Sequence, residues 1–308
     1  MKLFLLSFLT FPALLFAQKN PIELGDVHWL RTMPEAIAQS KQQNKPILIL
    51  FQEVPGCETC RNYGNDVLTH PLIVEAIETE FIPLCIFNNK SGHDAEILKR
   101  YNEPSWNNPV VRIVDSRGEN IVSRVNGNYS SAGLTGKMCD ALISVDGKAP
   151  AYLNLLVDEL NAEQSGTATT TYSMHCFWTG EALFGKLNGV VKTTAGFQSG
   201  KEVVAVEYNP QLISRAQLDK IALNQSCAIS SEGTFRKDST PKYYLSNSKY
   251  RVIPMTELQK CRVNSALGEG LSPEEFLSPR QIAFLHSGAE RNAIELSLVE
   301  GWQRSGLH

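Results

Sequence analysis

Apolar positions follow two different periods along the first half of the chain. They recur at helical spacing over 29–44, where Met33, Ala36 and Ile37 share one face. Continuous apolar runs are typical of strands buried on both faces of a sheet, and they occupy 46–51, 81–87 and 110–114. Further helices are predicted over 60–80 (interrupted near Pro71), 93–101 and 151–163. A turn at 116–118 predicts that 120–125 returns as a hairpin strand, so the order is α-β-α-β-α-β-β-α.

The pattern in the second half predicts a different order of elements. Small and polar residues fill 161–170, which we interpret as a linker. A strand ending near Ser173, a helix from Cys176, strands over 190–197 and 202–208, a helix over 214–223 and a candidate strand over 242–245 follow. This β-α-β-β-α-β order is typical of a split βαβ sandwich. The expected division of this two-domain α/β chain is a leader over 1–17, a domain over 18–163, a linker over 164–170 and a domain over 171–308.

The first residues indicate where the protein acts. Met1-Lys2 precedes an apolar stretch over 3–16 and a small residue, Ala17, which is the pattern of a secretory signal. The stretch is shorter than the roughly 20 residues that span a bilayer, and no later segment is long enough, so no stable membrane span is expected. We therefore predict a periplasmic or secreted protein.

Composition narrows the classes of partner and chemistry. The 308 residues carry a net charge of −3 with interspersed signs, which predicts that nucleic acid is not a partner. Seven cysteines, an odd number, leave at least one thiol unpaired within a secreted monomer. Their density is too low for a small scaffold held together by disulfides. Reactive thiols therefore explain the cysteines better than structural bridges do.

Cys57 and Cys60 form a Cys-x-x-Cys motif soon after the first buried strand. This position puts Cys57 at a helix N-terminus, where the thiolate is favoured, and Cys60 one turn below. The pair can then cycle between dithiol and disulfide. A structural disulfide and half of a zinc site are the alternatives. Because zinc would need a second nearby ligand pair, and none has matching spacing, no metal is expected.

The surroundings of this motif resemble the thioredoxin superfamily over residues 28–163. Within them Val54-Pro55-Gly56-Cys57 looks like a bacterial group in which selenocysteine often takes the first reactive place. The resemblance implies a thioredoxin fold. It also implies that Pro109, just before the third buried strand, is the cis-proline opposite the active site.

A second candidate site surrounds Cys176, which opens a predicted helix and is followed by Phe177 and Trp178. A thiol there faces unpaired backbone N–H groups and the positive end of the helix dipole, so its thiolate is favoured. The two aromatic side chains could form an apolar wall for a small uncharged group such as an S-methyl.

The stretch 175–184, His-Cys-Phe-Trp-Thr-Gly-Glu-Ala-Leu-Phe, resembles a signature of the peptide-methionine (S)-S-oxide reductases, or MsrA family. That signature reads Gly-Cys-Phe-Trp-Gly-x-Glu-x-x-Phe. The stretch 208–214, Tyr-Asn-Pro-Gln-Leu-Ile-Ser, continues the match in the family's order. The resemblance covers about 168–255 and implies that the second domain is a ferredoxin-like α+β sandwich of the MsrA type.

Site roles follow from this resemblance residue by residue. Cys176 is the nucleophile that attacks the sulfoxide sulfur, and Glu202 is the acid that protonates the sulfoxide oxygen. The substrate-binding residues are Phe177 and Trp178, which hold the methyl group, and Asp238 and Tyr243, which keep the family's spacing of an Asp and a Tyr. Resolving cysteines vary in place within the family, and both Cys227 and Cys261 are candidates.

Two departures from the family pattern bear on the site. In the family, a segment that contributes a second Tyr lies between a pair of glycines and the Glu that begins the next strand. This chain instead runs from Gly200 straight to Lys201-Glu202. One polar contact is therefore missing. His175 and Thr179 replace two glycines, and His175 either depresses the pKa of the thiol or is a bulky neighbour.

Three hypotheses follow. The first is an enzyme, without cofactor, that reduces methionine (S)-sulfoxide in exported proteins or peptides. In it the Cys57/Cys60 pair recycles Cys176 and is itself served by an external thiol reductant. The second is an extracytoplasmic thiol–disulfide oxidoreductase whose MsrA-like half binds clients without catalysis. The third is a non-catalytic adaptor or redox sensor.

Overall fold

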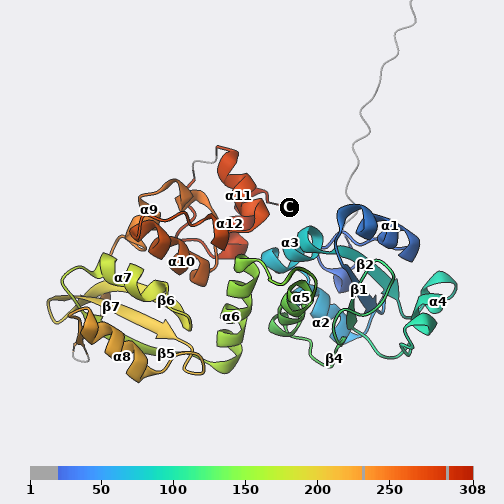
Figure 1. The fold of residues 1–308 in the computed structure, drawn as a ribbon, viewed down its shortest axis with the longest axis horizontal. Helices are drawn as coiled ribbons and strands as arrows, with labels where there is room; N and C mark the ends of the chain where they lie inside the picture. The colour runs from blue at the N-terminus through green and yellow to red at the C-terminus, as the bar shows by residue number, and fades with distance from the viewer. Residues whose placement is uncertain (1–19, 231–232, 289–290, 308) are drawn as a thin grey trace, which may run out of the picture.

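The protein is described by a computed structural model covering residues 20–230, 233–288 and 291–307. The predicted leader over 1–17 lies outside these residues. Figure 1 shows two lobes, an N-terminal unit (residues 20–165) and a C-terminal unit (the described residues of 166–307), with helix α6 (Ala151–Ser165) standing between them. None of the described helices is both long and apolar enough to cross a membrane.

The N-terminal unit is built around a four-stranded sheet of order β2-β1-β3-β4. Strand β1 (Ile47–Gln52) runs parallel to β2 (Ile82–Phe87) and antiparallel to β3 (Val110–Val114), and β4 (Val125–Asn126) pairs with β3. Alternate residues of β1 enter two cores: Leu48 and Leu50 pack towards α2, α3, α5 and α6, whereas Ile47 and Ile49 pack towards α1 and α4. This burial on both faces explains the continuous apolar run.

Six helices flank this sheet, and one of them has no clear signal in the sequence. They are α1 (Met33–Gln43), α2 (Glu58–Asp66), α3 (Pro71–Glu80), α4 (His93–Arg100), α5 (Ser131–Asp146) and α6. Helix α5 was not predicted, because Gly133, Thr135 and Gly136 are weak helix formers. The Ser130 side chain accepts from the Gly133 N–H and caps it. The predicted strand over 120–125 is reduced to one bridge at Asn120 and the two residues of β4.

The C-terminal unit holds a five-stranded antiparallel sheet of order β8-β5-β7-β6-β9. Its strands are β5 (Ala168–Ser173), β6 (Val190–Gln198), β7 (Lys201–Tyr208), β8 (Ala228–Ile229) and β9 (Arg236–Lys237), with helices α7 (Phe177–Gly185) and α8 (Arg215–Asn224). The predicted strand over 242–245 is wrong, since helix α9 (Tyr243–Ser246) lies there. Periodicity cannot separate strand from helix in so short an apolar run.

The expected flexible linker is also wrong. Helix α6 continues to Ser165 and β5 begins at Ala168, so only Gly166 and Thr167 separate them. Small and polar residues concealed both elements, although Ala162 is 2% and Thr170 4% exposed. The two units are therefore joined by a helix and a strand that each belong to packed structure.

The C-terminal helices fix the units against each other. They are α10 (Glu257–Gly268), α11 (Pro279–His286) and α12 (Leu298–Ser305). Short 3-10 turns lie at Lys249–Val252 and Glu274–Phe276 in the same unit, and at Ile22–Leu24 in the N-terminal unit. Leu298 and Trp302 of α12 enter the core of the N-terminal unit. Glu75 of α3 accepts hydrogen bonds from the Ser278 hydroxyl and the Arg280 N–H, each at 2.6 Å. The last part of the chain thus reaches back to the first.

A cavity of about 540 Å³ lies where the units meet, between α6, strand β6, the start of α10 and the segment before α12. Glu159 of α6 lines it and caps α10, because its Oε1 accepts from the N–H groups of Glu257 (3.1 Å) and Leu258 (3.3 Å). Its Oε2 is buried without a partner among the described residues. Burial raises the pKa of Glu159 to about 7 from its ordinary value of 4.5.

This shift predicts a pH dependence of stability. An acid whose pKa is higher in the folded state binds more protons there, so its contribution is full below pH 4.5 and is lost as pH rises through about 7. We expect the melting temperature of the wild type to fall relative to that of Glu159→Gln across this window. The corresponding loss in the free energy of unfolding should be at most about 3 kcal/mol. Exposed Glu163 on the same helix contributes a smaller part of this pKa shift than burial does, so the comparison variant Glu163→Gln should retain most of the wild-type pH dependence. Parallel curves for wild type and Glu159→Gln would contradict the prediction.

Candidate active site

The Cys57 and Cys60 thiols lie at the start of α2, directly after the loop that follows β1. Cys57 is the N-cap residue of the helix and is exposed, whereas Cys60 is fully buried one turn below. Their Sγ atoms are 3.4 Å apart, and both are free thiols. The Cys60 thiol donates to Asn108 Oδ1 at 2.7 Å. The structure therefore brings the predicted pair together as a dithiol.

The two thiols differ in acidity for identifiable reasons. The pKa of Cys57 is lowered, chiefly because the backbone N–H of Cys60 donates to it, while burial and the Glu53 carboxylate act in the opposite direction. Burial raises the pKa of Cys60 to about 12. Because the thiolate is the attacking species, Cys57 is the group suited to attack and Cys60 the group suited to resolve.

Pro109 lies beside this dithiol in the loop before β3. The Asn108–Pro109 peptide bond is cis, and so is Val54–Pro55, which the sequence does not indicate. The Asn108 side chain is oriented by its own amide, whose Nδ2 donates to the Ser105 carbonyl at 3.4 Å while Oδ1 faces Cys60. Asn108 is thus a contact of the thiol pair that motif spacing alone did not reveal.

Cys176 occupies the matching place at the start of α7. It is the N-cap residue, with extended backbone and a half-buried side chain. Glu202, near the start of β7, reaches the same helix end, where its Oε2 accepts from the Phe177 N–H at 3.0 Å. Gly180 allows α7 to pack closely against the Met174 side chain, since a Cβ there would lie 1.9 Å from Met174 Sδ. The predicted nucleophile and the predicted acid therefore meet at one helix terminus.

Aromatic side chains surround this helix end. Phe177 and Trp178 lie with ring centroids 5.6 Å apart, and Phe197 of β6 meets Phe177 edge-on at 5.2 Å. Tyr243 stacks on Trp178 with centroids 3.8 Å apart and planes 14° apart. Asp238 Oδ2 lies 3.5 Å from Trp178 Nε1. Phe177, Asp238 and Tyr243 thus gather around Trp178, the fourth predicted substrate-binding residue. Phe197, which the sequence analysis did not assign to the site, contacts Phe177.

The Trp178–Tyr243 stack limits which face of the indole a substrate can contact. Tyr243 covers one face of the indole, so that face offers no room for a substrate methyl group. On the other side of the helix end, His175 and Glu202 line an open cleft of about 370 Å³. His175 is exposed in this cleft. The cleft therefore gives access to Glu202 and to His175, the residue that precedes Cys176.

Cys227 lies next to the same cleft. It follows α8 and precedes β8, and its neighbours Ser226 and Ala228 line the cleft with His175 and Glu202. Cys227 itself is 6% exposed, and burial raises the pKa of its thiol. Of the two predicted resolving cysteines, Cys227 is thus the one that the fold brings to the Cys176 end of α7.

Cys261 is placed at the other end of α7. It is fully buried in α10, with its Sγ 3.7 Å from Thr193 Oγ1. A Cβ on Gly185, the last residue of α7, would lie 3.1 Å from the Cys261 carbonyl oxygen. Because a helix rises about 1.5 Å per residue, the Gly185 end of α7, which Cys261 contacts, lies about 13 Å from the Cys176 end. A disulfide needs Cα atoms within about 7 Å, so the structure does not bring this pair together.

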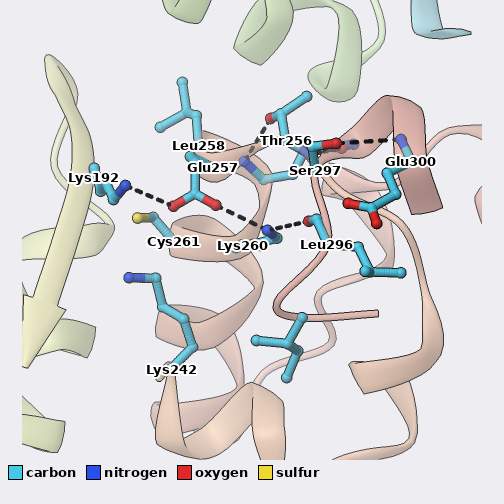
Figure 2. Close-up of polar contacts among 12 residues, drawn as sticks. Lys192, Lys242, Thr256, Glu257, Leu258, Lys260, Cys261, Leu296, Ser297 and Glu300 are labelled. Atoms are coloured by element: carbon cyan, nitrogen blue, oxygen red, sulfur yellow. Dashed lines mark hydrogen bonds and ion pairs between the residues drawn. The ribbon is translucent and has the colours of Figure 1, made fainter. Parts of the chain in front are cut away.

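Charged groups surround Cys261 instead. Figure 2 shows it on α10 between Glu257 and Lys242. Glu257 pairs with Lys192 at 3.5 Å, and buried Lys242 pairs with buried Glu181 at 3.1 Å. Burial acts to lower the pKa of Lys242, but the neighbouring Cys261 and Glu181 raise it. This buried ion pair was missed; the only sequence signal was that Glu181 and Lys242 each belong to a motif.

The two thiol sites occupy different lobes. Figure 1 shows α2 and α7 on opposite sides of α6. Among the described residues, the thiols of Cys57 and Cys60 make hydrogen-bond contacts with each other and with Asn108, all within the N-terminal unit. The fold thus assembles two separate sites, each with a cysteine at a helix N-terminus.

Comparison with known proteins supports the interpretation of the N-terminal unit. A family model described as thioredoxin-like matches residues 28–116. Among solved structures, a DsbH oxidoreductase is 20% identical, with a TM-score of 0.34 over 41% of this chain and 92% of its own. A thioredoxin from Thermus thermophilus is also 20% identical, with a TM-score of 0.34 over 39% of this chain and 91% of its own. The match to the family model identifies residues 28–116 as a thioredoxin-like region.

Curated relatives match a short part of the chain. A peptide methionine sulfoxide reductase MsrA of Methanococcus maripaludis is 32% identical over an alignment of 77 residues. The alignment covers 20% of this chain and 49% of the relative. A peptide methionine sulfoxide reductase of Drosophila melanogaster is 36% identical over 64 residues, 17% of this chain and 26% of the relative. The chain thus spans half or less of these relatives. Together with the thioredoxin-like region, they support a redox function related to methionine sulfoxide reduction.

Proposed function

We propose that the protein reduces methionine (S)-sulfoxide in exported proteins or peptides, through a C-terminal domain of the MsrA type with a ferredoxin-like sandwich. The observation that carries the proposal is the meeting of Cys176 and Glu202 at the N-terminus of α7, beside the Phe177–Trp178 pair. A sulfoxide becomes electrophilic when its oxygen is protonated, so a nucleophile and an acid must act on one substrate group together.

The proposed reaction proceeds in balanced steps. The Cys176 thiolate attacks the sulfoxide sulfur while Glu202 delivers a proton to its oxygen. Methionine leaves, and Cys176 retains the oxygen as a sulfenic acid. A second thiol then attacks the Cys176 sulfur, which releases water and forms a disulfide. The assay is turnover of a peptide (S)-sulfoxide by the full chain with dithiothreitol, and no turnover would refute the proposal.

Cys227 is the proposed second thiol, because it flanks the cleft that contains His175 and Glu202. After one turnover without reductant, the wild type and Cys261→Ser should both contain a Cys176–Cys227 disulfide. Cys227→Ser should instead accumulate the sulfenic acid, trapped by dimedone and located by peptide mapping. Loss of the disulfide in Cys261→Ser alone would assign resolution to Cys261.

We further propose that the Cys57–Cys60 pair recycles this disulfide and that the exchange takes place between two chains. The Cys57 thiolate attacks the disulfide, Cys60 releases the mixed disulfide, and an external thiol then reduces Cys57–Cys60. The packing supports exchange between chains, since Glu75 binds Ser278 and Arg280 across the units while the thiol sites lie on opposite sides of α6.

Two variant chains test this direction of exchange. One carries Cys60→Ser with Cys176→Ser, so it can attack but cannot release or reduce substrate. The other carries Cys57→Ser with Cys60→Ser and keeps Cys176 and Cys227. With sulfoxide present, the mixture should form a covalent heterodimer on a non-reducing gel. If no heterodimer forms, and the single variant Cys60→Ser instead contains a disulfide from Cys57 to its own C-terminal unit, exchange takes place within one chain.

The Trp178–Tyr243 stack favours a second candidate function, a thiol–disulfide oxidoreductase at Cys57–Cys60 whose C-terminal unit binds clients without catalysis. With one indole face covered, the aromatic groups form a smaller apolar wall. In that case the chain would reduce model disulfides and bind sulfoxide peptides but would leave the sulfoxide intact.

A further inference from the structure

A carboxylate and an amide oxygen lie beside the Cys57–Cys60 dithiol. Glu53 begins the loop that leads from β1 to α2, and one carboxylate oxygen lies within 4.8 Å of both sulfur atoms. Asn108 approaches from the loop before β3 and places Oδ1 2.7 Å from Cys60 Sγ. The two sulfur atoms and the Glu53 oxygen therefore form one cluster, and Asn108 Oδ1 contacts its Cys60 member.

This donor set has the composition of a tetrahedral metal site. Zinc in proteins takes four ligands, with bonds of about 2.3 Å to thiolate sulfur and about 2.0–2.2 Å to carboxylate oxygen. Tetrahedral geometry at those bond lengths places two sulfur ligands nearly 4 Å apart, close to the 3.4 Å observed between Cys57 and Cys60. Thiolates select soft or borderline metals, and the carboxylate favours a divalent one. The chemical class is therefore a divalent, thiophilic ion, of which Zn²⁺ is the representative.

The carboxylate has no evident use in thiol exchange. Its oxygen lies within 4.8 Å of both sulfur atoms, so the ionised carboxylate and a Cys57 thiolate repel each other. A divalent cation between the groups would turn this repulsion into attraction. The site is also reachable, since Cys57 is exposed. Motif spacing could not reveal it, because the second ligand pair is not a Cys/His motif: Glu53 lies upstream of the cysteines and Asn108 lies far downstream.

We propose that the reduced protein binds one Zn²⁺ through Cys57, Cys60, Glu53 and Asn108. Binding displaces a proton from each thiol, and no electrons are transferred. Both sulfur atoms are then metal ligands, so the metal-bound dithiol neither attacks disulfides nor oxidises. Zinc thus acts as a reversible block on the N-terminal site. This inference goes beyond the proposed function and does not depend on activity at Cys176.

Zinc competition with a chromophoric chelator, on the reduced full chain under anaerobic conditions, tests the proposal. One Zn²⁺ should bind per chain, and the reaction of Cys57 with Ellman's reagent should be blocked until a strong chelator is added. Glu53→Gln should weaken Zn²⁺ binding at least ~10-fold, since even outer partners of metal ligands contribute that much. Glu58→Gln is the matched control, because Glu58 carries the same charge beside Cys57 on exposed backbone outside the ligand group.

Further measurements separate a built site from simple chelation by two thiols. Asn108→Ala should also weaken binding, and its neighbour Asn107→Ala should not. Metal-free Glu53→Gln should react with Ellman's reagent at least as fast as the wild type, which shows that its fold and thiols are intact. Equal effects of Glu53→Gln and Glu58→Gln, no binding by the wild type, or one ion shared between two chains would each overturn the proposal.

Discussion

Cys176→Ser is expected to abolish reduction of a methionine (S)-sulfoxide. A serine hydroxyl is not ionised near neutral pH and is a far weaker nucleophile than a thiolate. The hydrogen bond from the Phe177 N–H to Glu202 does not involve the Cys176 side chain, so the site geometry should persist. Activity of the full chain should fall to background in an assay with a peptide (S)-sulfoxide and dithiothreitol.

The same variant contains its own control. Cys57 and Cys60 lie in the other lobe and contact Asn108, so reduction of a model disulfide by Cys176→Ser should match the wild type. Loss of both activities would indicate misfolding and require a circular dichroism comparison. Substantial sulfoxide turnover by Cys176→Ser would refute the assignment of the nucleophile.

Glu202→Gln is expected to lower kcat by ~100-fold or more, because general acid catalysis contributes about 10²–10⁴-fold. The glutamine keeps the shape of the side chain, and its Oε1 can still accept from the Phe177 N–H, but it cannot deliver a proton. Steady-state kinetics on the peptide sulfoxide separate the two roles. A change confined to KM would show that Glu202 binds substrate without protonating it.

Glu207→Gln is the matched control for this experiment. Glu207 lies on the same strand, β7, and accepts a hydrogen bond from Thr167 at the strand's other end. Its neutralisation removes the same charge from the same element and should leave kcat within about 2-fold, as expected for a surface site away from the reacting atoms. An equal loss in both variants would point to a general effect of charge on the C-terminal unit.

The buried strands could be predicted from the sequence because their environment is the same on both faces. Every residue of β1 is buried, which favours the apolar run Ile47–Phe51, and the polar Gln52 at its end donates to the Glu23 and Cys60 carbonyls. Helix α5 escaped prediction because its glycines and threonine do not favour a helix, and its packing on the core of the N-terminal unit stabilises it. The linker over 161–170 failed for a related reason, since small residues suit tight packing as well as flexible chain.

Motif residues that lie within one short segment were well placed by the sequence. Cys57 with Cys60, and Cys176 with Phe177 and Trp178, are held by the local geometry of a helix N-terminus. The dipole and unpaired N–H groups of that terminus act on any cysteine at the N-cap position. These features follow from local backbone structure and need no distant partner.

Only the tertiary structure distinguished Cys227 from Cys261 and brought Glu53 and Asn108 to the Cys57–Cys60 pair. Each choice depends on which segments meet in space: β8 brings Cys227 beside the cleft, while α10 places Cys261 at the far end of α7. The sequence by itself determined the two helix-terminal thiols and the buried strands, since neighbouring residues and period specify them. Contacts between segments far apart in the chain depend on the packing of whole elements, and local pattern does not encode that packing.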